Sequence, residues 1–252
     1  MDNYMSDVAS LMQEPQDYYP PSPPPTEQCH TLQDGRRVAL HLVGHSATEA
    51  HHVWNGSRFV ADLFEAEPER VRGRSVLELG AGAGLPSLVA GLVGARRVVM
   101  TDFPDPELVA AMQRNVDEAA VQQVVRVLGF VWGGDAAPLL AALAPEDKGF
   151  DVLVLADLLF RHSEHGALVR TICQTMRRTA SSAAYVFFTS YRPWKQAADM
   201  AFFDVARAAG LAVRLLAERK LDAPLFADDP GDVEVQKTVR GFMVCWPDSA
   251  PE

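Results

Sequence analysis

The sequence predicts an α/β fold: a mostly parallel, Rossmann-like seven-stranded sheet with an antiparallel final strand and helices on both faces. Short apolar runs alternate with helical stretches along most of the chain after residue 75. This alternation is typical of parallel strands joined by crossover helices. A glycine-rich turn follows the first of these strands, and an acidic residue ends the second. With 252 residues, the chain can bury such a core as one domain without disulfides.

The N-terminal segment, residues 1–30, is predicted to be a disordered, proline-rich tail. It is poor in large aliphatic residues, and its prolines cannot build a helix or an internal strand. Five of them fall within six residues: Pro20, Pro21, Pro23, Pro24 and Pro25. Partner binding is the alternative role for this tail. Residues 31–252 are assigned to one folded domain.

The remaining elements follow from hydrophobic periodicity. An edge strand is expected at residues 37–43, and a helix starts near residues 55–57, with Trp54 at its entrance. The strands of the main sheet are expected at residues 75–79, 98–101, 124–129, 150–155, 184–190, 212–216 and 241–246. Helices are expected at residues 84–93, 106–120, 136–143, 163–179 and 196–209. The segment 222–234 is too polar for a crossover helix, so the last two strands are expected to be antiparallel.

The strongest signal is the run Ser75-Val-Leu-Glu-Leu-Gly-Ala-Gly-Ala-Gly-Leu-Pro-Ser87. Its turn has no bulky side chain, so the backbone can approach a ligand closely. The turn residues are Gly80, Ala81 and Gly82. Dinucleotide-binding proteins have a third glycine where this chain has Leu85, whereas Glu78, before the turn, suits the cationic end of S-adenosylmethionine. A tight turn without a ligand is the alternative.

Two further residues are spaced as a nucleoside site requires. Asp102 ends the next strand, 22 residues after Gly80 (102 − 80), where a carboxylate can accept hydrogen bonds from ribose hydroxyls. Capping the following helix is the alternative role for Asp102. Trp132 follows the third strand, where its ring would contact adenine, although a tryptophan buried in the core is the alternative. Together with the turn, these residues predict a site for S-adenosylmethionine.

The fourth strand ends in Ala156 and Asp157, at the sheet edge where such folds bind ligands. Ala156 is small enough for its backbone to contact the cofactor. A lysine amine must lose a proton before it attacks a methyl group, and Asp157 is the candidate to orient it or help the proton leave. Phe160, Tyr191 and Trp194 can enclose a cationic product. Asp157, Phe160 and Tyr191 are therefore the predicted catalytic residues.

No metal site is predicted. His162, Glu164 and His165 are close in sequence, but Ser163 and Glu164 equally suit the start of a helix. No further His/Cys cluster supports a metal. The three cysteines are far apart and form no CxxC pair, which argues against a disulfide framework and a zinc site.

Charge and hydropathy restrict the partners. The formal net charge of -10 disfavours nonspecific binding of nucleic acid. It is compatible with a lysine-bearing peptide, although acidity that only maintains solubility explains it equally well. No apolar run approaches the roughly 20 residues of a membrane helix, and the N-terminus lacks a secretory pattern. We expect a cytoplasmic monomer that contacts neither membrane nor nucleic acid.

Several segments together match a known family. They are Val53-Trp54-Asn55, residues 76–87, residues 101–106, Asn115, Trp132-Gly133, residues 156–160, residues 162–165 and Arg192-Pro-Trp194. In these segments the chain resembles the family-16 methyltransferases of the seven-strand class. Residues 102–106 (Asp-Phe-Pro-Asp-Pro) and 162–165 (His-Ser-Glu-His) are the most specific. They resemble the fungal branch that methylates the N-terminal glycine and adjacent lysine of translation elongation factor 1-alpha.

The resemblance implies roles for individual residues. The residues that it places against S-adenosylmethionine are Trp54, Gly80, Ala81, Gly82, Asp102, Trp132 and Ala156. Residues 157–160 correspond to the acid-x-x-aromatic substrate motif of the family. The chain departs from the expected pattern at Arg161, where the family has Asn, and at Tyr191, where it has His. Both departures lie near the expected substrate mouth.

Four other functions fit parts of the pattern. A small-molecule methyltransferase acting on a nicotinamide-like ring would not need Asp157, because a pyridine nitrogen has no proton to lose. Another non-histone protein lysine methyltransferase would share the same site. A cofactor-binding scaffold without catalysis would not need Asp157 and Phe160. A nicotinamide-dinucleotide oxidoreductase is disfavoured by Leu85.

Overall fold

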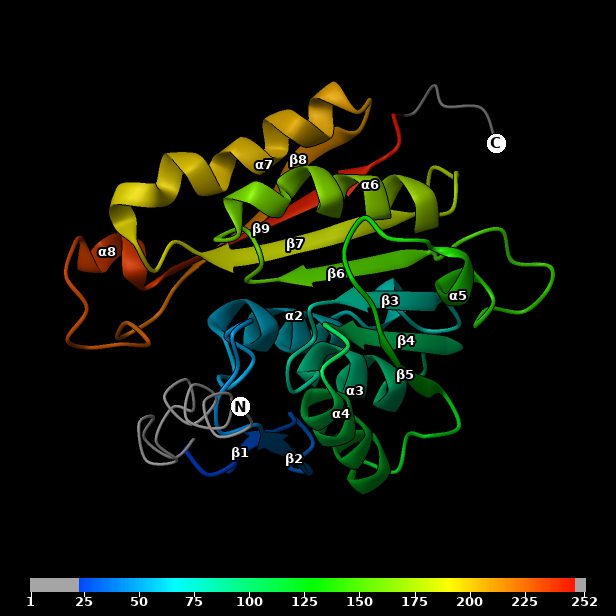
Figure 1. The fold of residues 1–252 in the computed structure, drawn as a ribbon, viewed down its shortest axis with the longest axis horizontal. Helices are drawn as coiled ribbons and strands as arrows, with labels where there is room; N and C mark the ends of the chain where they lie inside the picture. Colours follow the sequence, from blue (N-terminus) through cyan, green and yellow to red (C-terminus); the bar gives the residue numbers. More distant parts are fainter. Residues whose placement is uncertain (1–22, 248–252) are drawn as a thin grey trace, which may run out of the picture.

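The computed structural model describes residues 23–247 and contains a seven-stranded sheet of order β5-β4-β3-β6-β7-β9-β8 (Figure 1). Its strands are β3 Ser75–Leu79, β4 Arg97–Asp102, β5 Val125–Gly129, β6 Val152–Ala156, β7 Ala183–Thr189, β8 Ala212–Lys220 and β9 Thr238–Cys245. Strands β3 to β7 pair in parallel, and β9 lies antiparallel between β7 and β8. The predicted fold class is confirmed, including the antiparallel final strand.

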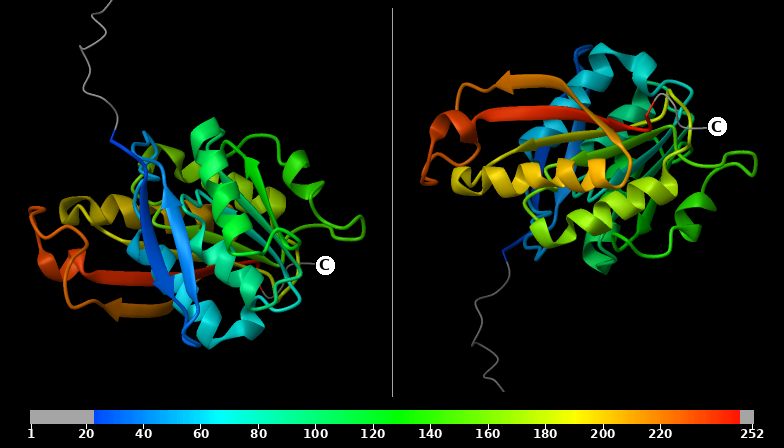
Figure 2. Two further views of the ribbon diagram at one scale, coloured as in Figure 1. Left: turned by 90° about the horizontal axis from the view of Figure 1, so that it is seen from below. Right: turned by 90° about the horizontal axis from the view of Figure 1, so that it is seen from above.

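Helices cover both faces of the sheet, as Figures 1 and 2 show. On one face lie α2 Asn55–Ala66, α3 Leu85–Leu92 and α4 Pro106–Glu118; on the other lie α5 Ala137–Leu140, α6 His165–Thr175 and α7 Gln196–Ala208. Alternate side chains of one strand enter the two cores: Val152 and Val154 pack toward α2 and α3, whereas Leu153 and Leu155 pack toward α6 and α7. This two-sided burial explains why the strands are continuous apolar runs.

Ordered structure begins earlier than expected, and the strand expected at the edge of the sheet pairs elsewhere. Strand β1 spans Thr26–Thr31 and forms a separate antiparallel hairpin with β2, Arg37–Leu42. The hairpin lies against α4, where Asn115 accepts from the His41 amide (2.7 Å) and donates to the His41 carbonyl (3.0 Å). The folded domain therefore includes residues assigned above to the tail. The expected disorder of residues 1–22 concerns residues outside the described part of the chain.

Other differences are local. The expected helix at 163–179 begins as a 3-10 turn, His162–Glu164, and α6 ends at Thr175, because Met176 bridges to Phe150. A 3-10 turn at Pro68–Arg70 follows α2, and another at Pro193–Lys195 precedes α7. The acidic segment between β8 and β9 contains the short helix α8, Val233–Gln236. Within residues 23–247, no helix has the length and apolar character needed to cross a membrane.

Candidate functional site

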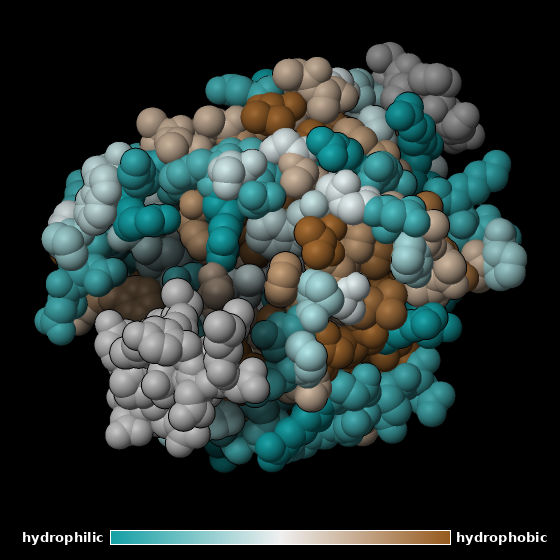
Figure 3. Space-filling model, viewed as in Figure 1, coloured by the Kyte–Doolittle hydropathy of each residue, from teal (hydrophilic) through white to brown (hydrophobic). Residues whose placement is uncertain are grey.

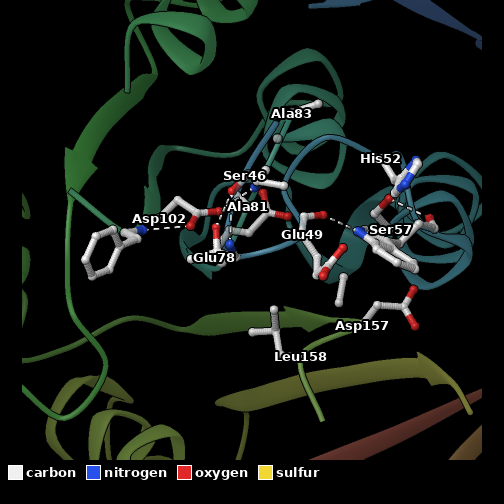
Figure 4. Close-up of a pocket in the computed structure, with 18 of the residues that line it drawn as sticks. Ser46, Glu49, His52, Ser57, Glu78, Ala81, Ala83, Asp102, Asp157 and Leu158 are labelled. Atoms are coloured by element: carbon white, nitrogen blue, oxygen red, sulfur yellow. Dashed lines mark hydrogen bonds between the residues drawn. The ribbon is translucent and has the colours of Figure 1, made fainter. Parts of the chain in front are cut away.

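A cavity of about 470 Å³ opens at the carboxyl ends of β3, β4 and β6 (Figure 4). Because neighbouring parallel strands end at one edge, residues far apart in sequence meet there. All eight predicted cofactor residues line it: Trp54, Glu78, Gly80, Ala81, Gly82, Asp102, Trp132 and Ala156. Asp157 and Phe160 also line it. In Figure 4, Glu78 and Asp102 lie close together, and Asp157 lies toward the other end.

The turn after β3 requires glycine at position 80. Gly80 has a φ of 62°, a left-handed conformation that other residues rarely adopt. A Cβ atom there would lie 2.6 Å from Cδ2 of Leu158 and 3.0 Å from Cζ2 of Trp132. Leu158 and Trp132 therefore pack directly against Gly80 and fill the space that a larger side chain would need.

Glu78 is buried at the base of this turn. The residue is only 1% exposed, and its Oε2 atom accepts a hydrogen bond from the Ser87 amide at 2.9 Å. Burial raises the pKa of Glu78 to about 8, and the nearby charge of Asp102 adds to the effect. The carboxyl group is therefore mostly protonated at neutral pH until a cation approaches it.

Asp102 fastens the turn to the second strand. Oδ2 accepts the Gly82 amide and Oδ1 accepts the Phe103 amide, each at 2.7 Å. Burial raises the pKa of Asp102. Asp105, not Asp102, caps α4, since it accepts the Glu107 and Leu108 amides. Among the described residues, neither Asp102 nor Glu78 has an ion-pair partner, so this end of the cavity favours a cationic ligand and disfavours a pyrophosphate.

The segment 46–53 forms a further wall of the cavity that the sequence patterns did not predict. The Trp54 indole donates to the Glu49 carbonyl at 2.9 Å, and Nη2 of Arg161 donates to the Ala47 carbonyl. The Thr48 amide donates to the hydroxyl of Ser46 at 3.1 Å. The Ser46–Thr48 turn, a few residues before Trp54, was the available signal, but a turn of this kind does not indicate where the segment lies in the fold.

Asp157 lines the cavity and is more enclosed than expected. The residue is 4% exposed and has a φ of 56°. Oδ1 accepts the Thr189 amide at 2.7 Å, Oδ2 accepts the Gly56 amide, and the nearby Tyr191 hydroxyl lowers the pKa of the carboxyl group. Burial raises the pKa of Asp157 to about 7 against these stabilising bonds. A single carboxylate thus links the ends of β6 and β7 to the start of α2.

A second cavity of about 570 Å³ adjoins the first. The two share Trp54, Asp157, Phe160 and Arg161 among their lining residues. Tyr191 lines only the second, together with Phe226 from the segment between β8 and β9. Phe226 was missed because the acidic character of its segment suggested only a solvated loop. Asp157 and Phe160 therefore lie at the junction of two cavities.

Tyr191 is held at this junction by backbone and aromatic contacts. Its hydroxyl accepts the Asn55 amide at 3.1 Å, and its ring lies 4.9 Å from that of Trp54. Burial and the adjacent Asp157 raise the pKa of Tyr191 well above its ordinary value, so the hydroxyl keeps its proton. Trp194, which we expected to help enclose the product, is 59% exposed and lines neither cavity.

The histidines after β6 take part in hydrogen bonds. Nε2 of His162 lies 2.7 Å from Asp199, and Nε2 of His165 lies 2.8 Å from the Leu159 carbonyl. The first contact attaches the segment after β6 to the start of α7, and the second lies within that segment. A separate group, where β1 packs on α2, places ligand atoms within 4.8 Å of one another: His30, Asp62 and Glu65. Arg219 also contacts Asp62 there.

The chain is similar to known proteins in sequence and in fold. A family model described as lysine methyltransferase matches residues 40–208. A protein of Gibberella zeae named protein N-terminal and lysine N-methyltransferase EFM7 is 57% identical over 248 residues, which cover 94% of each chain. Proteins of the same name from Neurospora crassa and Schizosaccharomyces pombe are 51% and 37% identical, covering 96% and 94% of this chain and 89% and 95% of theirs.

Solved structures share the fold at low sequence identity. TYW2 of P. horikoshii, crystallised in complex with MeSAdo, has a TM-score of 0.54 at 15% identity, covering 91% of this chain and 74% of that one. An O-methyltransferase of Bacillus cereus in complex with SAH has a TM-score of 0.50 at 15% identity, covering 78% and 83%. The seven-stranded sheet is thus that of methyltransferases.

Proposed function

Because the chain belongs to the lysine methyltransferase family, we propose that it is a protein N-methyltransferase that uses S-adenosylmethionine. We further propose that it methylates the N-terminal glycine amine and the adjacent lysine of translation elongation factor 1-alpha. The observation that carries the proposal is the junction of two cavities at Asp157 and Phe160. One cavity has the charge and shape for a cationic nucleoside, and the other provides an aromatic approach for an amine.

The residues of the first cavity fit S-adenosylmethionine. Its volume of about 470 Å³ lies within the range of small-molecule sites. The turn at residues 80–82 lines the cavity without a bulky side chain, and the carboxyl groups of Glu78 and Asp102 complement positive charge. Trp132, which packs over Gly80, offers a ring face for an adenine. When bound there, the cofactor supplies an activated methyl group.

The residues at the junction position the attacking amine. In-line displacement needs a free lone pair aimed at the methyl carbon, so the amine must be deprotonated and oriented. Asp157 lines both cavities, and with a pKa of about 7 it can exchange a proton near neutral pH. The Gly56 and Thr189 amides hold the carboxyl group of Asp157 in place, and the ring of Phe160 limits where the amine can lie.

The substrate is testable in cells of the source organism that lack this chain. Mass spectrometry of elongation factor 1-alpha should show loss of methyl groups from its N-terminal amine and adjacent lysine. Restoring the chain should restore them. Unchanged methylation in the deletion strain would reject this substrate.

Replacing Asp102 with alanine is expected to weaken binding of S-adenosylhomocysteine by about 1–3 kcal/mol. The change removes a charged acceptor in the cavity and leaves the Gly82 amide unpaired. Calorimetric titration measures the affinity. Asp135→Ala is the matched control, because Asp135 accepts the Ala137 amide but does not line the cavity. Equal affinities of the two variants would show that Asp102 does not hold the cofactor.

Binding of S-adenosylmethionine is expected to release a proton near pH 7. Burial holds the pKa of Glu78 at about 8 in the free protein, and a cation nearby lowers it. The ligand prefers the ionised form, so affinity should rise with pH, by up to about tenfold per unit, and level off above pH 8. Titrations in phosphate and Tris buffers measure the release. It should vanish in Glu78→Gln; a persistent release would assign the proton to another group.

A further inference from the structure

The segment between β8 and β9 starts at the β8 edge of the sheet and reaches the junction of the two cavities. Strand β8 is an edge strand, yet Phe226 in the following segment contacts residues at the start of α2. The Phe226 ring centroid lies 5.8 Å from that of Trp54, 6.0 Å from that of Tyr191 and 5.2 Å from that of His52. The rings of Trp54, Tyr191 and Phe226 form one aromatic wall of the second cavity, and His52 packs on Phe226 from the first cavity.

Buried hydrogen bonds hold the segment in this position. The side-chain amide of Gln236, which is 2% exposed, donates to the carbonyls of Pro230 (3.0 Å) and Asp229 (3.4 Å). It also donates to the Tyr191 carbonyl at 3.3 Å. Gly231 packs against the rings of Pro193 and Trp194. The position of the segment is thus coupled to that of Tyr191.

The segment presents negative charge beside the aromatic wall, in a cavity that Arg161 and Arg192 also line. Residues 221–234 contain five acidic residues and no lysine or arginine. Asp232 caps α8, and Glu234 pairs with Lys220 and Lys237. No cation within residues 23–247 pairs with Asp222, Asp228 or Asp229, and of these three only Asp229 lines the second cavity. Figure 3 shows a largely hydrophilic surface at this end of the molecule.

We propose that Phe226 and Asp229 form a specificity wall that selects a basic, unblocked N-terminal peptide as the substrate. The inference rests on the proposed function and assigns the wall to this same site. Phe226 packs on the first residues of the peptide as the terminal amine enters toward Asp157. The carboxylate of Asp229 pairs with the ammonium of a lysine at the second position. An acidic or blocked N-terminus lacks these contacts.

The test uses the full chain and two synthetic peptides with a free N-terminal glycine, one with lysine and one with glutamine at position two. Asp229→Asn should raise KM for the lysine peptide about fivefold, the usual scale for an exposed ion pair, and leave the glutamine peptide unchanged. Phe226→Ala should raise KM for both peptides about tenfold. In both variants kcat and cofactor affinity should stay within about twofold of wild type.

Asp222→Asn is the control, because this carboxylate lies on the same segment but outside the cavity. If Asp229→Asn and Asp222→Asn give the same KM for the lysine peptide, Asp229 does not recognise the lysine side chain. If wild type transfers no methyl group to either peptide, the proposed function fails instead. In that case, fluorescence anisotropy of the lysine peptide, labelled at its C-terminus, measures peptide binding and tests the specificity wall independently of methyl transfer. Equal affinity of wild type and Asp229→Asn for the lysine peptide overturns it.

Discussion

Replacing Asp157 with asparagine is expected to lower the rate of methyl transfer to a protein amine by at least about 100-fold. Asparagine tolerates the left-handed backbone that Asp157 adopts, at a φ of 56°, so this substitution avoids the strain that alanine would add. It removes the group that can accept a proton where the two cavities meet. It also places an amide NH₂ or carbonyl against the Gly56 and Thr189 amides, which now meet carboxylate oxygens.

Single-turnover methyl transfer from labelled cofactor measures this effect, and titration with S-adenosylhomocysteine serves as the folding control. Cofactor affinity should change by no more than a few-fold, because Asp157 lies away from Glu78 and Asp102 (Figure 4). Tyr191→Phe keeps the carboxylate and removes a nearby hydroxyl that lowers its pKa, so it should lower the rate less. An unchanged rate in Asp157→Asn would favour a substrate whose nitrogen carries no proton, such as a pyridine.

Replacing Gly80 with alanine is expected to weaken cofactor binding by about 100-fold. The new Cβ would press on Leu158 and Trp132 and displace the surfaces that line the cavity. Part of the effect of any such substitution is backbone strain, because φ is positive. Gly73→Ala is the matched control: its φ is 70°, and a Cβ there meets nothing within 4 Å.

Thermal unfolding and calorimetric titration together separate the two effects. Both variants should lose stability through strain, by about 1–2 kcal/mol, but only Gly80→Ala should lose affinity. If both variants bind S-adenosylhomocysteine as wild type does, the turn at residue 80 is not the contact surface we describe.

The residues around the first cavity could be predicted because they follow strands. The Gly80 turn, Asp102 and Ala156 each come directly after or at the end of a buried strand, and Trp132 comes three residues after the end of β5. Parallel strands bring their carboxyl ends to one edge, so the order of the strands along the chain was enough to gather these residues. The spacing did not reveal that Asp102 also binds the Gly82 amide.

The second cavity could not be predicted in the same way. Phe226 lies in a segment without periodicity, and it reaches Trp54 only because β9 lies antiparallel between β7 and β8 and because Gln236 holds the segment. The wall at residues 46–53 likewise depends on Arg161 and Trp54, distant partners that no local pattern specifies. Tyr191 was predicted near the substrate, but its bond to the Asn55 amide depends on tertiary packing.

The most direct test is a crystal structure of the chain with S-adenosylhomocysteine. We predict that the nucleoside lies in the first cavity, along the turn at residues 80–82 and against Trp132, with its ribose hydroxyls toward Asp102 and its sulfur toward Asp157. A nucleoside bound outside this cavity, or one whose sulfur faces away from the junction with the second cavity, would contradict the account.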